Sequence, residues 1–256
     1  TLLCLSMLSI GAQSDSINID LSDIIIKENR IELSFNDVSR NIELITKQDI
    51  QNLRATSINE LLQVVAGVDI RQRGVNGVQA DLSIRGGTFE QALVLINGVK
   101  MLDPQTGHHL MNLPVSLEDI ERIEVLKGPA ARIYGQNGFA GAINIVTKVS
   151  TEKSITVGIE AGDHGLFNGL AKVSAPIGAY AQTVSYAYNS SEGYRDNTDY
   201  DIHNLFYQGD LAVGTGNLSV FGGYSSRDFG ANGFYGSENF VNQYEEVNTS
   251  ILSVSL

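Results

Sequence analysis

The 256 residues contain one cysteine, four prolines and no tryptophan, and acidic side chains outnumber basic ones 29 to 17. A single thiol, Cys4, cannot form an intrachain disulfide, and one thiolate is too few for a zinc site built from cysteines. The net charge of −12 argues against a nucleic acid partner, because phosphate binding requires a basic surface. No run of 18 apolar residues follows residue 12, so no transmembrane helix is expected.

Residues 1–12, TLLCLSMLSIGA, form an apolar run that is followed by polar Gln13. The run is too short to cross a bilayer as a helix and is typical of a partial secretory signal peptide with its cleavage site. A buried N-terminal strand or helix is the alternative. Cleavage would remove Cys4, so the mature chain would have no cysteine nucleophile. Because no initiating Met precedes the run, we expect the sequence to start inside its reading frame.

Helical and strand patterns alternate between residues 42 and 148, which predicts an α+β domain of about 110 residues. Residues 42–46 are expected to form a strand, and Thr46 with Asp49 three residues later predicts a capped helix. Ser57 and Glu60 repeat that spacing before a second helix, whose apolar face is Ile58, Leu61, Leu62 and Val65 and whose stop is Gly67. Five short strands are expected next, at residues 68–71, 82–85, 93–96, 123–126 and 142–147. 

Beyond Ser154 the periodicity changes to two, as in Ile155, Val157 and Ile159. Similar segments of about ten residues, the length of a tilted strand that crosses a bilayer, are predicted near residues 167–175, 180–189, 204–213, 218–226 and 250–256. Their connections alternate between short (175–179, 214–217) and long (190–202, 227–247), as in outer-membrane barrels. Fifteen of the 19 Phe and Tyr residues lie after residue 150, which favours lipid contact. A soluble β-sandwich would give a similar alternation.

One stretch, residues 120–148, reads IERIEVLKGPAARIYGQNGFAGAINIVTK. Together with SIRG at residues 83–86 and LVLINGV at residues 93–99, it resembles the plug domain of TonB-dependent outer-membrane receptors. The resemblance covers about residues 22–148. It marks as structural positions of the plug Arg85, Gly86, Asn97, Gly98, Gly128, Pro129, Tyr134, Gly135 and Gly141. The pair Asn97-Gly98 is also a tight-turn signal in its own right.

The resemblance implies a partial signal peptide at 1–12, a periplasmic segment at 13–40, a plug domain at 41–148 and the first barrel strands at 149–256. Barrels of this family that hold a plug have 22 strands. Six strands cannot close in lipid, where every edge must be paired, so the chain is expected to be a fragment of such a barrel.

The implied function is active uptake of a scarce ligand, of the cobalamin or ferric siderophore class, across the outer membrane of a Gram-negative bacterium. The expected partners are TonB, the small-molecule ligand and outer-membrane lipid, and no cofactor is expected to be required. The TonB box is predicted at Asp23, Ile24, Ile25, Ile26 and Lys27, because a β-branched run suits addition to the edge of a partner's sheet. Alternatively, this run is simply the first plug strand.

Two plug loops correspond in order to ligand-contacting loops of the family. Their candidate ligand-binding residues are Gln72, Arg73, Asn76, Gln79, Asp103, Gln105, Thr106, His108 and His109. The adjacent histidines also raise a metal interpretation, but without a third ligand at suitable spacing ordinary loop polarity is favoured. Arg85 is expected to pair with acidic side chains in the lumen, with a surface position as the alternative.

An acidic cluster on the first long barrel loop offers oxygen atoms that suit calcium. A possible calcium site therefore includes Asp196, Asp199 and Asp201, with Glu192 and Asn197 nearby. The cluster lacks the glycine and terminal glutamate of an EF-hand, and solvated loop charge is the alternative.

Neither the G-x-x-G-x-x-G of residues 135–141 nor Lys127-Gly128-Pro129 fits a nucleotide site, because the helix N-terminus or the downstream Gly-Lys-Ser/Thr is missing. No triad or carboxylate pair supports catalysis. Two other functions stay open: a surface receptor or adhesin without energised transport, and a soluble secreted binding protein.

Overall fold

The computed structural model describes residues 25–28, 31–34, 42–103, 105–129, 134, 136–236 and 240–256. The chain divides into two units, Thr1–Ser39 and Arg40–Leu256. In the first unit, β1 (Ile25–Glu28) pairs antiparallel with β2 (Ile31–Ser34). The predicted signal peptide lies outside the described residues.

The plug part of the second unit contains a five-stranded sheet in the order β3-β8-β9-β6-β7. Its strands are β3 (Ile42–Thr46), β6 (Ala92–Ile96), β7 (Val99–Met101), β8 (Ile120–Lys127) and β9 (Gly141–Thr147). β6 and β9 run parallel, whereas the other pairs are antiparallel. A separate ribbon joins β4 (Val68–Gln72) to β5 (Ala80–Ile84). The mixed α+β domain predicted from the sequence is therefore confirmed.

The described residues of the plug also contain two helices and three 3-10 turns: α1 (Lys47–Leu53), α2 (Ile58–Gln63), η3 (Phe89–Gln91), η4 (Gly107–His109) and η5 (Leu117–Asp119). Thr46 caps α1 in a reciprocal capping box with Asp49, as predicted. Ser57 caps α2 by accepting from the backbone N–H of Glu60, but the box is only half formed. The Glu60 carboxylate accepts instead from the backbone N–H of Thr56, at 2.8 Å.

Apolar side chains of the plug strands and of α2 form one core. Leu61 and Leu62 are buried there and Ile58 packs against the core, which confirms this part of the predicted helix face. The helix ends at Gln63, before the predicted stop at Gly67, so buried Val65 lies just beyond it. Asn97 and Gly98 both have positive φ, 51° and 80°, and make the tight turn between β6 and β7. The Asn97 amide exchanges hydrogen bonds with Thr147, at 2.8 and 2.9 Å, and so fastens this turn to the end of β9.

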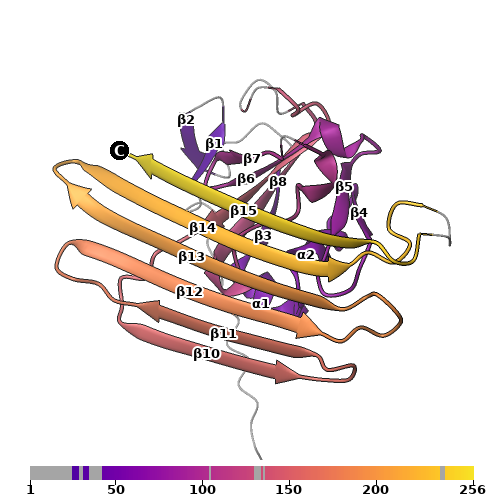
Figure 1. Cartoon of the computed structure of the whole chain (residues 1–256). Helices are drawn as coiled ribbons and strands as arrows, with labels where there is room; N and C mark the ends of the chain where they lie inside the picture. The colour runs from indigo at the N-terminus through magenta and orange to yellow at the C-terminus, as the bar shows by residue number, and fades with distance from the viewer. Residues whose placement is uncertain are drawn as a thin grey trace, which may run out of the picture. The chain divides into compact units, whose positions relative to one another are not determined.

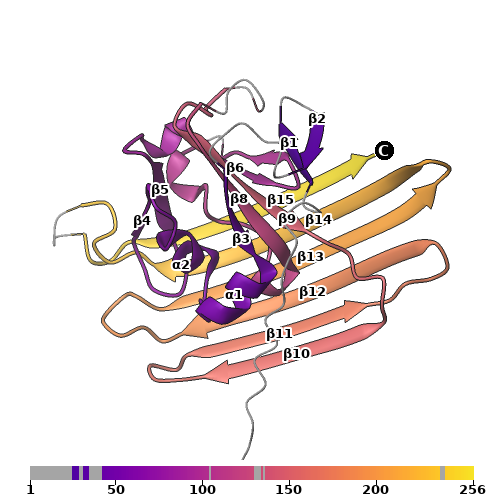
Figure 2. The ribbon, with the colours of Figure 1, turned by 180° about the vertical axis from the view of Figure 1, so that it is seen from behind.

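The second part of this unit is a six-stranded antiparallel sheet in sequential order, here called the wall. It consists of β10 (Ser154–Ala161), β11 (Phe167–Ser174), β12 (Tyr180–Ser191), β13 (Tyr200–Val213), β14 (Gly216–Gly230) and β15 (Tyr244–Ser255). The plug lies against one face of the wall (Figures 1 and 2). Phe206 and Phe221 of the wall belong to the plug's own apolar core.

Four strands of the wall, β12 to β15, are longer than the sequence predicted. β13 starts at Tyr200 and β14 continues to Gly230, because Tyr200 pairs with Phe229 and the ladder runs on through the polar residues between. The connections shrink to residues 192–199 and 231–243, so the predicted loops 190–202 and 227–247 were too long. The sequence did not show this extension, because Asp201 and Asp228 alternate with Tyr200, Ile202, Arg227 and Phe229, which are buried.

The outward face of the wall carries exposed apolar side chains. Its members include Ile155, Val157, Ile159, Val184, Tyr186, Leu205, Leu252 and Val254. On β12 the inward positions Thr183, Ser185 and Ala187 are buried against the plug. This confirms the predicted alternation. In the part of the chain that the structure describes, no helix is long and apolar enough to cross a bilayer.

Candidate functional site

The two predicted ligand loops come together at one end of the plug, where β4, β5 and η4 meet the connection between β14 and β15. Arg73, just after β4, binds the Asp81 carboxylate of β5 through Nε and Nη2, at 3.1 and 2.5 Å. The other Asp81 oxygen lies 2.6 Å from Nδ1 of His108. One buried carboxylate therefore holds a residue from each predicted loop.

Aromatic rings flank the His108 side chain of this network. The His108 ring lies 4.6 Å from the ring of Phe89 and 5.5 Å from that of Tyr235, measured between centroids. Tyr235 follows β14, and its ring lies 5.7 Å from the Arg73 guanidinium carbon. The Gln79 amide donates to the Tyr235 hydroxyl. We call Arg73, Gln79, Asp81, His108 and Tyr235 the apical cluster.

Burial alone would raise the pKa of Asp81, but the hydrogen bonds and charges of His108 and Arg73 outweigh it and hold the pKa below its ordinary 3.8. Burial raises the pKa of Tyr235, and Glu245 raises it further through a hydrogen bond and its charge. Asp81 is thus an anion and Tyr235 a neutral phenol at physiological pH. The apical cluster is a charge-assisted network rather than a set of free ligand-binding groups.

His109 connects the plug to the wall beside the apical cluster. Its Nε2 lies 3.2 Å from a carboxylate oxygen of Glu245 on β15, and its Nδ1 lies 3.5 Å from Asp103. A hollow of about 410 Å³ opens here between the plug and the β14–β15 region. Its lining consists of Thr106, His108, His109, Tyr235, Tyr244, Glu245, Glu246 and Val247.

The other predicted loop residues have different surroundings. Asp103 Oδ1 accepts from the backbone N–H groups of Gln105 and Thr106, at 2.7 and 3.1 Å, so it shapes its own loop. Gln105 is exposed and Gln72 ends β4. Asn76, with φ of 52°, donates to the Tyr200 hydroxyl of the wall at 2.7 Å.

Three residues of this region escaped sequence reasoning: Asp81, Tyr235 and Glu245. Asp81 had a local signal, an isolated acid inside the apolar strand ADLSI. The other two lie more than 120 residues away along the chain, in stretches that the sequence showed only as polar loop. No local pattern could bring them to the plug.

The predicted TonB box is only partly described. Ile25, Ile26 and Lys27 lie in β1, and Asp23 and Ile24 fall outside the described residues. Within those residues β1 pairs only with β2, so its other edge has no strand beside it. This arrangement suits strand addition, and the TonB box stays a prediction.

Most plug positions marked by the resemblance have a structural explanation. Gly141 sits where a Cβ would lie 2.4 Å from the carbonyl oxygen of Leu126, so only glycine lets β8 and β9 approach. Gly86 and Gly128 have positive φ, 75° and 111°. Tyr134 packs beside the small core of Leu93, Leu95, Leu126 and Ala142. Pro129 is exposed and Gly135 lies outside the described residues.

Arg85 is exposed, with φ of 51°, and no acidic partner lies within ion-pair distance among the described residues. The carbonyl oxygen of Gly67 accepts its backbone N–H at 2.7 Å, which fixes the left-handed turn after β5. The pairing of Arg85 with acidic side chains in the lumen stays a prediction, as does the surface alternative.

Residues of the acidic loop have partners within the protein, and the calcium site stays a prediction. Asp201 accepts from the Tyr188 hydroxyl at 2.6 Å and lies 2.8 Å from His203 Nε2, while Asn197 donates to carbonyl oxygens of the 231–243 connection. Across the described ranges, no three acidic or histidine side chains converge as metal ligands, and this includes Glu192, Asp196, Asp199 and the histidine pair. The cluster contributes loop packing and negative charge.

Comparison with known proteins identifies the plug. The family model described as "TonB-dependent Receptor Plug Domain" matches residues 34–142. Over 131 residues the chain is 35% identical to the vitamin B12 transporter BtuB of Vibrio vulnificus, which is 51% of this chain and 21% of that protein. The BtuB of Vibrio cholerae serotype O1 is 34% identical over 139 residues, 54% of this chain and 22% of that protein.

Solved structures extend the likeness to the wall. The Pseudomonas aeruginosa receptor FpvA, solved with heterologous pyoverdines, superposes with a TM-score of 0.72 at 16% identity. The match covers 89% of this chain and 33% of FpvA. The fold is therefore that of a plug domain followed by the antiparallel strands of a plugged receptor. The chain spans about a fifth of the length of the curated relatives it matches. These relatives are transporters and receptors, not enzymes.

Proposed function

Because this chain belongs to the TonB-dependent receptors, we propose that its whole protein takes up a scarce small molecule across the outer membrane with energy delivered through TonB. The ligand class is cobalamin or a ferric siderophore. The observation that carries the proposal is the joint hollow of plug and wall. His109 and Thr106 on the plug line it together with Glu245 on the wall, so a ligand bound there would contact both the plug and the wall.

The outward face of the wall supports an outer-membrane location. Ile155, Val157 and Ile159 on β10 are 68–76% exposed, and Leu252 and Val254 on β15 are 77% and 64% exposed. Apolar side chains in this number at outward positions are costly in water and favourable against lipid. A soluble binding protein would have no reason to keep them.

The test uses the full-length receptor and an Ile25→Pro variant in β1. Proline removes a backbone donor and should weaken strand addition to TonB, whereas the matched control Ile25→Val keeps the donor and the β-branched shape. We expect Ile25→Pro to bind cyanocobalamin or a ferric siderophore at the cell surface as wild type does, but to lose uptake. The control should transport normally.

Two other outcomes would reject the proposal. Binding without uptake in the wild type, in cells with working TonB, would indicate the passive surface receptor or adhesin. Uptake that Ile25→Pro leaves unchanged would show that energy does not enter through β1.

A further inference from the structure

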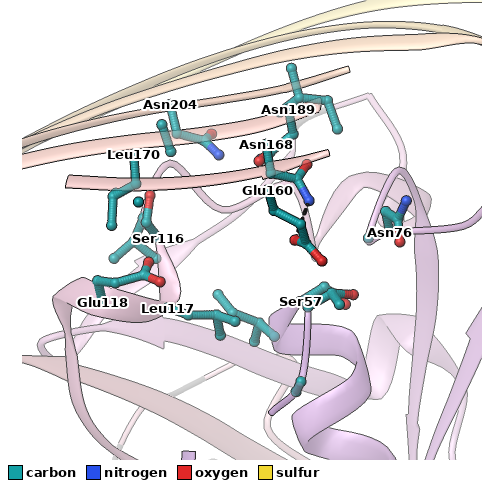
Figure 3. A pocket seen from close by; sticks show the side chains of 18 of the residues that line it. Ser57, Asn76, Ser116, Leu117, Glu118, Glu160, Asn168, Leu170, Asn189 and Asn204 are labelled. Atoms are coloured by element: carbon teal, nitrogen blue, oxygen red, sulfur yellow. Dashed lines mark hydrogen bonds between the residues drawn. The ribbon is translucent and has the colours of Figure 1, made fainter. Parts of the chain in front are cut away.

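A second cavity, of about 400 Å³, lies between the plug and the wall (Figure 3). On the plug side it is bounded by residues 54–59, 76–77 and 111–118. On the wall side it is bounded by residues of β10 to β14. Apart from the plug loop residues Asn76 and Gly77, none of the predicted ligand-binding segments takes part in it.

The register of the wall explains why this space exists. Gly158, Leu170, Ala187 and Asn204 are successive cross-strand partners on the inward face of β10 to β13. Two of these four residues, Gly158 and Ala187, have the smallest side chains of the row, and all four line the cavity. Small side chains in this row leave room between the wall and the plug.

The next inward row carries charged and amide side chains. It contains Glu160, Asn168, Asn189, Ile202 and Arg227, again as cross-strand partners. The Asn168 amide donates to Glu160 at 2.8 Å, as the dashed line in Figure 3 shows. The row thus begins with the carboxylate of Glu160, continues with the amides of Asn168 and Asn189, and ends with the guanidinium of Arg227. The row offers donors and acceptors with nearly balanced charge.

Asn204 provides the second, independent observation. Its residue is only 6% exposed, yet its Oδ1 has no hydrogen-bond partner among the described residues. A buried acceptor without a partner costs about 1–3 kcal/mol, so a donor in the cavity, from water or from a solute, would stabilise it. Asn204 lines the cavity together with Leu170 and Ser116 (Figure 3).

Arg227 is buried at the other end of the row and has no carboxylate partner in the described part of the chain. Its Nη1 donates to the carbonyl oxygens of Gly77 and Val78, at 2.9 and 3.3 Å, and its Nη2 to that of Leu113 at 3.4 Å. A guanidinium has five donors, and the long distance at Nη2 leaves donor capacity toward the cavity.

Charge decides which solute such a cavity prefers. The charged residues of the lining are Arg54, Glu118, Glu160 and Arg227, two of each sign, and burial raises the pKa of Glu118. The same desolvation penalises an anionic solute. An uncharged molecule with both donors and acceptors meets the amide groups of Asn189 and Asn204 without that cost.

We propose that this cavity is an internal binding site for uncharged amide or hydroxyl groups of the transported molecule, held between the Asn168–Asn189–Asn204 amides and the plug. The inference rests on the proposed function, which it deepens by naming the chemistry that passes the plug.

The first experiment probes the cavity directly in the full-length receptor, in outer membranes and in a Cys4→Ser background. Asn204→Cys is labelled with N-ethylmaleimide, and Thr183→Cys is the control, because Thr183 is inward and 5% exposed but outside the cavity. We expect faster labelling of Asn204→Cys. Acetamide should slow that labelling, whereas acetate of the same size and concentration should not.

Two results would overturn the inference. Equal, slow labelling at both positions would show that the space is packed in the whole receptor. Labelling of Asn204→Cys that acetamide leaves unchanged would show a gap that holds water only. Either result stands whether or not the protein transports anything.

The second experiment measures uptake and surface binding of cyanocobalamin and of a ferric siderophore. Asn204→Leu keeps the number and branching of the side-chain heavy atoms and removes the amide, and Asn189→Leu repeats the change on the next strand. We expect surface binding to be unchanged and uptake of an amide-bearing ligand to fall about tenfold in either variant. Normal uptake by both variants would overturn the inference, whereas absent uptake by the wild type would reject the proposed function instead.

Discussion

Replacing Asp81 by Asn removes the charge that holds both predicted ligand loops together. Arg73 and His108 then lose their ionic partner, although Arg73 keeps the carbonyl oxygen of Phe234. Breaking a buried ion pair costs about 3–5 kcal/mol. The Arg73 side chain is 15% exposed and Asn retains an acceptor, so we expect about 2 kcal/mol.

The assay is amide hydrogen exchange of β4 and β5 in the full-length receptor. A loss of about 2 kcal/mol in local stability corresponds to about 30-fold faster exchange, since 1.4 kcal/mol is tenfold. Asp69→Asn is the matched control, because Asp69 lies on β4 of the same ribbon and is exposed. An effect of Asp81→Asn no larger than that of Asp69→Asn would refute the network as the source of order in these loops.

Three further predictions concern stability. Because folding lowers the pKa of Asp81, its ionised carboxylate stabilises the folded state above pH 3.8. This stabilisation is lost as the pH falls below 3.8 through the folded pKa, and amide hydrogen exchange of β5 measured as a function of pH would show the loss. Gly141→Val should prevent β8–β9 pairing and receptor assembly, measured as heat-modifiable barrel in membranes, whereas Gly98→Val should assemble with a loss of about 1–2 kcal/mol from its positive φ. Lys172→Met should loosen the plug by removing the 3.1 Å ion pair with buried Asp119, seen as faster proteolysis of the plug, and unchanged proteolysis would contradict it.

Local patterns were enough to predict much of the plug and the direction of every wall strand. The cap at Thr46, the turn at Asn97-Gly98 and the period-two alternation after Ser154 each depend on neighbouring residues only. Such short-range signals do not require knowledge of the fold. The strand ends of β13 and β14 were missed for the same reason, because only the partner strand shows that pairing continues to Tyr200 and Phe229.

The sequence by itself determined the family motifs, the order of plug and wall, and which loops carry polar groups. Only the tertiary structure decided what those groups do, because their partners are distant along the chain. Gln79 meets Tyr235 across 156 residues and His109 meets Glu245 across 136. The internal cavity arises likewise from the register of several strands, which places Gly158, Ala187 and Asn204 in one row. Contacts of that range are set by packing and strand pairing, which no local pattern encodes.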